Sequence, residues 1–138
     1  MLNLNVSQSD KQALAVDLQG LDYEWQGSGK VLISCDMQKL IKANKLLYAG
    51  YGLYAALAEY GLTIAANCDL GSYRVSTMEI ECLHEARDGL LQMEAQILDT
   101  EYGFVNATCE IRAASGAGPK RLLARACATL IAQERHRD

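Results

Sequence analysis

The chain has 138 residues and half of them are apolar, so it is long enough for one compact domain with a substantial core. Thirteen basic and seventeen acidic residues give a net charge of −4, with no basic cluster beyond Lys120-Arg121. This balance argues against a nucleic-acid partner held by phosphate contacts and favours a small-molecule partner.

The N-terminus carries neither the basic n-region nor the apolar h-region of a signal peptide. Glu59 interrupts the longest apolar run before it reaches the roughly 18 residues of a membrane-spanning helix. The five cysteines are widely spaced, with no C-x-x-C pair and no histidine cluster nearby, which supports neither a disulfide framework nor a zinc site. We expect a soluble, cytoplasmic, single-domain protein over 1–138, with reduced thiols and without a bound metal or cofactor.

A short helix and a strand are the first elements expected. Residues 7–18 space their apolar side chains as in a short amphipathic helix, with Ser7 or Ser9 as its N-cap. Residues 29–37 alternate apolar and polar side chains, which predicts a half-buried strand. The basic and polar residues in 38–50 then indicate a loop or an irregular turn.

A long helix is expected from Gly50 to about Asn67. Nearly every face of this segment is apolar, which is typical of a helix enclosed by other elements. Gly50 and Gly52 suit its start. Glu59 is the one charged residue between Tyr51 and Ala66.

Four consecutive strands are expected after the helix. Apolar and polar residues alternate in the segments 73–82, 90–98 and 104–112, and the closing segment 121–133 is the fourth strand. Turn residues separate the last three strands from their predecessors. An antiparallel sheet with one apolar face must cover that face, and the long helix is the available cover. The pattern predicts an α+β fold with five strands wrapped around one central helix.

The helix sequence "GYGLYAALAEYG" resembles the central helix of phenylacetate-pathway thioesterases of the hot-dog superfamily. In that family the helix opens with His-Gly-Gly and continues through small apolar residues to an acidic residue. Gly50, Tyr51 and Gly52 stand at the opening triplet and Glu59 at the acidic position, so the histidine and the glycine after it are replaced here. Residues 86–89 are similar to the family's turn between strands, and the resemblance runs over about 29–133, the expected core.

An uncharacterised branch of the same superfamily is similar at a further place. It carries an Asn, then Tyr-Ala-Gly, then a helix reaching Leu-Ala-Glu, and these stand here as Asn44, Tyr48 to Gly50, and Leu57 to Glu59. The resemblance implies a hot-dog fold and an acyl-CoA thioesterase activity, with coenzyme A as part of the substrate.

Glu59 is the candidate general base for thioester hydrolysis. The residues three and four positions away on either side are not cations, so a buried carboxylate here would have a raised pKa. The alternative is that Glu59 faces a subunit boundary or a polar pocket and is satisfied there by hydrogen bonds.

Other candidate site residues surround the start of the helix or lie in turns. The backbone amides at Gly50 and Gly52 would bind the thioester oxygen, and Asn44 would help to orient it. Thr77 resembles a position from which a partner subunit contributes a polar group. The expected substrate-binding residues are Tyr48, Tyr51, Thr77, Arg87, Lys120 and Arg121, the three basic ones toward the coenzyme A phosphates. Each also has a plain reading, as a helix-start glycine, a loop asparagine, a surface threonine or a solvated charge.

The resemblance implies a homodimer, or a tetramer built from two dimers, with sites between subunits. The two histidines, His84 and His136, lie far from the long helix in sequence, which counts against the hydratase and dehydratase branches. The expected function is hydrolysis of a small or medium acyl-CoA or aryl-CoA thioester. The alternatives are a non-catalytic module that binds acyl-CoA or acyl-carrier thioesters, and a structural partner-binding domain.

Overall fold

The computed structural model describes residues 21–27, 29–43, 50–69, 71–86, 89–114 and 120–133, without the side chains at 43, 50, 51, 68 and 69. The helix expected at 7–18 lies outside the described residues. Two helices and six strands are described: β1 (Asp22–Gly27), β2 (Lys30–Asp36), α2 (Met37–Ala43), α3 (Gly50–Asp69), β3 (Tyr73–Cys82), β4 (Leu90–Glu101), β5 (Phe104–Ala113) and β6 (Leu122–Ala132). Neither described helix is long and apolar enough to cross a membrane.

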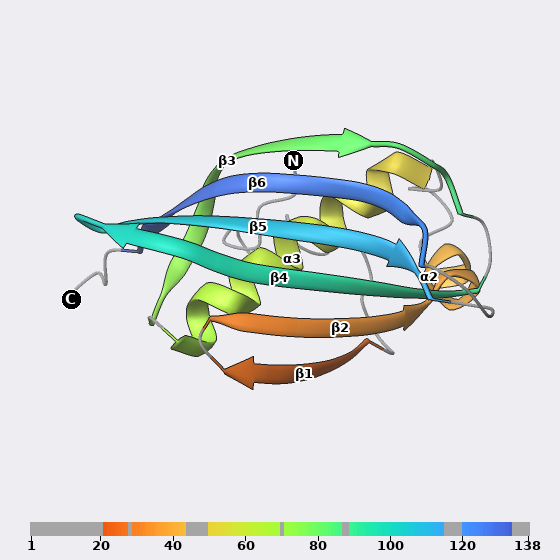
Figure 1. Ribbon diagram of the computed structural model, residues 1–138, viewed down its shortest axis with the longest axis horizontal. Helices are drawn as coiled ribbons and strands as arrows, with labels where there is room; N and C mark the ends of the chain where they lie inside the picture. Colours follow the sequence, from red (N-terminus) through yellow and green to blue (C-terminus); the bar gives the residue numbers. More distant parts are fainter. Residues whose placement is uncertain are drawn as a thin grey trace.

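The strands form one antiparallel sheet in the order β1-β2-β4-β5-β6-β3. The sheet curves around α3, which lies along its inner face (Figure 1). The strand that follows α3 crosses to the far edge and pairs with β6, so β1 and β3 are the two edge strands. The expected architecture of a long helix enclosed by an antiparallel sheet is confirmed.

The core lies between the inner face of the sheet and α3. Alternate residues of the central strands point inward and are buried, and they meet the apolar side chains of the helix. Gly61 lies on the helix face that meets the sheet: a Cβ there would lie 3.0 Å from Cε and 3.1 Å from Sδ of Met93. Because Gly61 has no side chain, the Met93 side chain of β4 packs directly against the helix backbone.

The prediction of a loop after β2 was wrong, because α2 occupies the first part of that segment. The Asp36 carboxylate accepts hydrogen bonds from the backbone N–H groups of Gln38 (2.8 Å) and Lys39 (3.3 Å), which caps the helix. Met37 and Leu40, three positions apart, are buried beneath it. The N-cap and this helical spacing were the signals in the sequence.

The prediction of five strands omitted β1. This strand pairs with β2 along Asp22–Gly27 and turns through Gly27 and Gly29, both with positive φ. Tyr23 and Trp25 alternate with polar residues, yet they stay 59% and 39% exposed. The apolar side chains of this edge strand lie outside the core. Their alternation with polar residues is therefore the one signal for the strand in the sequence.

Candidate functional site

Glu59 lies in the middle of α3 and is 4% exposed. Its Oε2 atom has no hydrogen-bond partner, and Glu59 is the one buried charged residue in the described part of the chain. Burial raises the pKa of this carboxyl from 4.5 to about 7, because removal from water disfavours the ionised form. The group can therefore exchange a proton at neutral pH, as a general base must.

Thr63 stands one helical turn after Glu59. Its hydroxyl donates a hydrogen bond of 2.8 Å to the backbone carbonyl of Glu59, so it does not neutralise the carboxylate. Leu62, also one turn away, is fully buried, and Ala55 and Ala56 occupy the preceding turn. As the sequence predicts, no cation from its own helix stands beside Glu59.

The N-terminal end of α3 carries two of the predicted site residues. The helix begins at Gly50, and Gly52 is exposed in the first turn. The first amides of any α-helix have no partner within the helix, so they are available to a ligand oxygen. Asn44, Tyr48 and Arg87 lie outside the described residues, as does the side chain of Tyr51.

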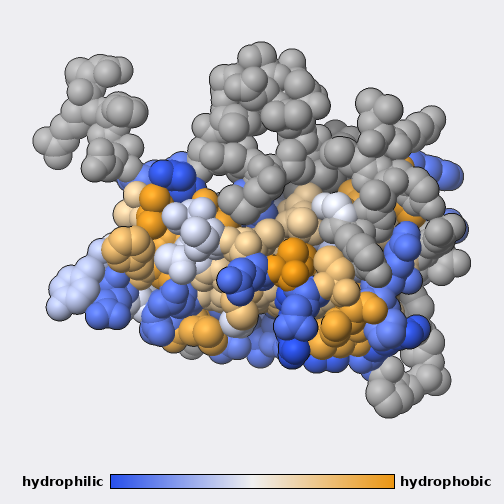
Figure 2. Space-filling view, turned by 90° about the horizontal axis from the view of Figure 1, so that it is seen from above, coloured by the Kyte–Doolittle hydropathy of each residue, from blue (hydrophilic) through white to orange (hydrophobic). Residues whose placement is uncertain are grey.

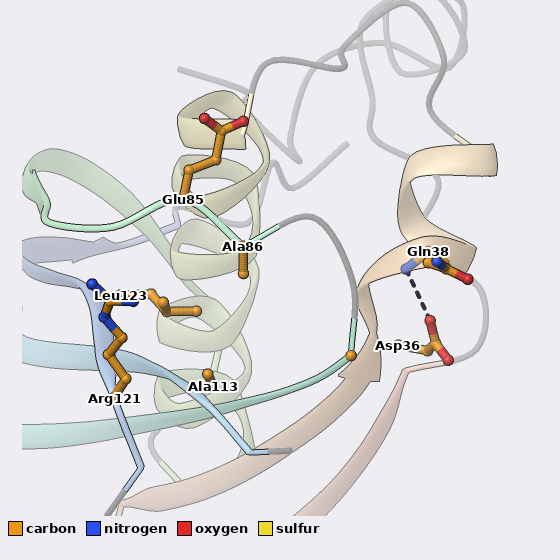
Figure 3. Close-up of a pocket in the computed structure, with 8 residues that line it drawn as sticks. Asp36, Gln38, Glu85, Ala86, Ala113, Arg121 and Leu123 are labelled. Atoms are coloured by element: carbon orange, nitrogen blue, oxygen red, sulfur yellow. Dashed lines mark hydrogen bonds between the residues drawn. The ribbon is translucent and has the colours of Figure 1, made fainter. Parts of the chain in front are cut away.

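A pocket of about 480 Å³ opens near this end of α3, where β4 and β6 begin and β5 ends. Its lining comes from five segments of the chain and combines charged, polar and small apolar residues: Asp36, Gln38, Glu85, Ala86, Gly89, Ala113, Arg121 and Leu123. Figure 3 shows Glu85 and Ala86 on the β3–β4 connection in front of α3, with Arg121 and Leu123 on one side and Asp36 and Gln38 on the other. This volume falls in the range of small-molecule sites.

The structure separates the two predicted basic residues of the β5–β6 turn. Arg121 lines the pocket, and its guanidinium lies 2.8 Å from Nδ1 of His84. Lys120 is exposed and its Nζ contacts the side-chain oxygen of Gln92, which alternates with the inward residues of β4. Of these two cations, Arg121 is the one that a ligand in the pocket would meet.

Thr77 and Glu59 lie on different sides of the sheet within one protomer. Thr77 is exposed on β3 opposite Thr129 of β6, and the Thr129 hydroxyl donates to Asn106 at 3.1 Å. The next residue, Met78, points inward instead. Glu59 is likewise not among the residues that line the pocket, so the described chain does not gather all predicted site residues in one cavity.

Burial raises the pKa of three cysteine thiols as it does that of Glu59, but for a thiol this shift lowers the reactivity. Burial, and then the charge of Asp36, raises the pKa of Cys35 to about 12. Burial also raises the pKa of Cys82 and of Cys109. These thiols stay protonated at neutral pH, and the protonated form is a poor nucleophile. In the described residues, no group of three His, Cys, Asp or Glu side chains is placed to hold a metal ion.

The sequence suggests Tyr54 only as aromatic surface for an acyl or aryl group and does not reveal that its hydroxyl reaches the pocket wall. It accepts a hydrogen bond of 2.7 Å from the backbone N–H of Ala86. In the sequence, Tyr54 resembles any apolar position of the helix. The pocket itself was also missed, because residues as distant as Asp36 and Leu123 form it only after the sheet has closed.

No family model matches the sequence, and no curated protein matches it. Solved structures are similar in fold. The PaaI protein of the phenylacetic acid degradation operon of E. coli aligns with a TM-score of 0.68 at 15% identity, over 91% of this chain and 85% of that one. A thioesterase of Haemophilus influenzae aligns with 0.69 at 16% identity, over 89% and 85%.

A thioesterase family protein of Silicibacter pomeroyi aligns with a TM-score of 0.66 at 15% identity, over 89% of this chain and 92% of that one. In all three cases the alignment spans most of both chains. Together with the sheet that wraps around α3, these similarities confirm the fold expected from the resemblance. The chain has the hot-dog fold.

Proposed function

We propose that the protein hydrolyses an acyl-CoA or aryl-CoA thioester of small or medium size, with Glu59 as the general base. The observation that carries this proposal is the buried carboxyl of Glu59, with an unpartnered oxygen and a pKa near 7, at the centre of a thioesterase-superfamily fold. An unpaired buried acid is costly to a fold, and such groups are concentrated at functional sites.

The proposed reaction needs one proton acceptor and one set of hydrogen-bond donors. The ionised Glu59 takes a proton from water while the water oxygen adds to the thioester carbonyl carbon. Backbone amides at Gly50 to Gly52 stabilise the negative charge on the carbonyl oxygen. The C–S bond then breaks, and the departing thiolate takes the proton back from Glu59.

The spacing along α3 supports a site shared by two subunits. Gly52 and Glu59 are about 10 Å apart along the helix axis, farther than one glutamate side chain extends. In a homodimer, the helix start of one protomer and Glu59 of the other would act on the same thioester. We therefore propose a homodimer, alone or paired into a tetramer.

The edge strand β3 is the proposed dimer contact. Met78 and Ile80 point inward from this edge and are half-buried in the single chain. Figure 2 views the molecule from the side of β3 and shows apolar residues across the middle of this face. Pairing of β3 with its copy would cover both the strand edge and these side chains. Sedimentation velocity should find a dimer or a tetramer, and a monomer at micromolar concentration would contradict the shared site.

Coenzyme A is the proposed carrier, and Arg121 the proposed contact to its phosphates in the pocket, with Lys120 and Arg87 at the rim. Asn44 is proposed to orient the thioester, and Tyr48, Tyr51 and Thr77 to contact the substrate. No basic patch suited to an acidic carrier protein accompanies Arg121 among the residues that line the pocket. Arg121 is the one cation among these lining residues, which also include the carboxylates of Asp36 and Glu85.

The test is thiol release from a panel of short, medium and aryl acyl-CoA thioesters by wild type and Glu59→Gln, with the signal of the protein's own five cysteines subtracted. We expect turnover of one class by the wild type and its loss in the folded variant. Retained turnover in Glu59→Gln would remove Glu59 from the mechanism.

A non-catalytic acyl-CoA-binding module is the second candidate. The observation that favours it is the position of Glu59, which is nearly inaccessible and does not line the pocket of the single chain. This candidate predicts that coenzyme A raises the melting temperature while no thioester releases thiol. A structural domain without either property would show neither response.

A further inference from the structure

The segment Leu83–Ala86, which follows β3, forms one wall of the pocket through Glu85 and Ala86. On the β6 side it is held by polar contacts: the N–H groups of Leu83 and His84 both donate to the carbonyl of Leu123, at 2.8 and 3.1 Å. Leu83 is 41% exposed, and His84 and Glu85 are exposed as well. Hydrogen bonds rather than buried apolar side chains therefore fix most of this wall.

On the helix side, the wall is held by Tyr54. The Ala86 N–H lies outside any strand and donates to the Tyr54 hydroxyl at 2.7 Å. Tyr54 is fully buried, so its ring position is set by the core and its hydroxyl reaches the wall from a fixed point. A phenylalanine would fill the same core volume, but it would leave the Ala86 N–H without this acceptor.

The same helix carries Glu59, about 7.5 Å farther along its axis. Because an α-helix is rigid over this distance, the Tyr54 hydroxyl sets the position of the wall relative to Glu59. Figure 3 shows the wall passing directly in front of α3, between the residues of β6 and those of α2. The wall, the pocket and the candidate base thus share one support.

We infer that Tyr54 is a positioning residue, whose hydroxyl holds the Leu83–Ala86 wall against α3 and so sets the width of the pocket for its ligand. We call the hydrogen bond from the Ala86 N–H to the Tyr54 hydroxyl the latch. The identity of the ligand rests on the proposed function, and the latch does not. Loss of the hydroxyl loosens the wall and weakens ligand binding, while the chemistry at Glu59 continues at a similar rate.

Hydrogen–deuterium exchange followed by mass spectrometry tests the latch without any assay of activity. In Tyr54→Phe, peptides that contain 83–86 should exchange roughly tenfold faster, and peptides from β5 should not change. Tyr60→Phe, which removes a hydroxyl from a half-buried tyrosine of the same helix, is the matched control and should leave the wall unchanged. Ala86→Pro removes the N–H that donates to Tyr54 and should also speed exchange of the wall. In the double variant with Tyr54→Phe, the two effects should not add, because both changes remove the same hydrogen bond.

The ligand arm measures KM and kcat for the best thioester, or the Kd of coenzyme A by calorimetry if no thioester turns over. Tyr54→Phe should raise KM or Kd roughly three- to tenfold and change kcat less than about twofold. Unchanged exchange at the wall would overturn the latch, and faster exchange with unchanged KM or Kd would overturn its role in binding. Faster exchange in a protein that neither binds coenzyme A nor cleaves any thioester would sink the proposed function and leave the latch standing.

Discussion

On the outer face of the sheet, each of three carboxylates has a basic partner, whereas Glu59 on the helix side has none among the residues that the structure describes. Lys30 pairs with Glu94 at 3.2 Å, Arg112 with Glu110 at 2.8 Å and Arg125 with Glu81 at 3.4 Å. These groups are all partly exposed to water. Glu59 is buried and one of its oxygens is unpartnered.

The difference shows two separate uses of acidic residues in one fold. The outer pairs are partly exposed to water, so they contribute little to stability. Burial disfavours the ionised form of Glu59 and raises its pKa, so stability does not explain why this sequence keeps an acid there. This contrast supports the proposed catalytic role of Glu59.

The largest expected effect is on activity, and it distinguishes the buried Glu59 from the paired carboxylates of the outer face. Glu59→Gln should lower kcat for thioester hydrolysis by about 10²- to 10⁴-fold, the usual contribution of a general base. Glu94→Gln makes the same chemical change on the outer face and should stay within about twofold of wild type, because its interaction is exposed and weak. Equal losses in the two variants would erase the distinction.

The next effect concerns stability against pH. The pKa of Glu59 is about 7 in the fold and near its ordinary 4.5 in the unfolded chain, so the folded state binds this proton more tightly. The contribution of this group to the free energy of unfolding is complete below pH 4.5 and is lost as pH rises through 7, a change of about 3 kcal/mol.

Urea unfolding of wild type and Glu59→Gln at pH 5 and pH 8 measures that change. The variant should gain stability relative to wild type between the two pH values, by about 3 kcal/mol at most. A constant difference between the two proteins would mean that Glu59 does not titrate in this range. This test does not depend on any enzymatic activity.

The smallest effect is expected on the outer face. Lys30→Ala removes the partner of Glu94, which also lies directly opposite Glu110 in the sheet. Because these side chains are partly exposed, the free energy of unfolding should fall by less than about 1 kcal/mol, and less again at high salt. A larger loss that salt does not reduce would show that the outer network is a structural element.

The long periodic segments made the fold predictable. The five strands β2 to β6 and α3 follow directly from alternating or continuous apolar residues, and Glu59 is conspicuous as the one charge in the apolar part of that helix. α2 was missed because its signals are one cap at Asp36 and two buried residues. β1 was missed because Tyr23 and Trp25 alternate over only a few residues.

The pocket was less predictable, because its residues meet only in three dimensions. Arg121 was expected at a ligand site, but nothing in the sequence places it beside Glu85 and Asp36. Tyr54 looks like a core residue in sequence, and it is one; only the position of its hydroxyl beside Ala86 reveals the second role. Local patterns report burial, while a site depends on contacts between remote segments.

The pH dependence of kcat for thiol release, measured on wild type with the best acyl-CoA substrate, tests the central claim most directly. A general base with a pKa near 7 must be ionised to act, so log kcat should rise with unit slope below pH 7 and level off above it. The residual activity of Glu59→Gln should lack this inflection. A profile that is flat from pH 5 to 9, or an inflection that persists in Glu59→Gln, would contradict the assignment of Glu59 as the base.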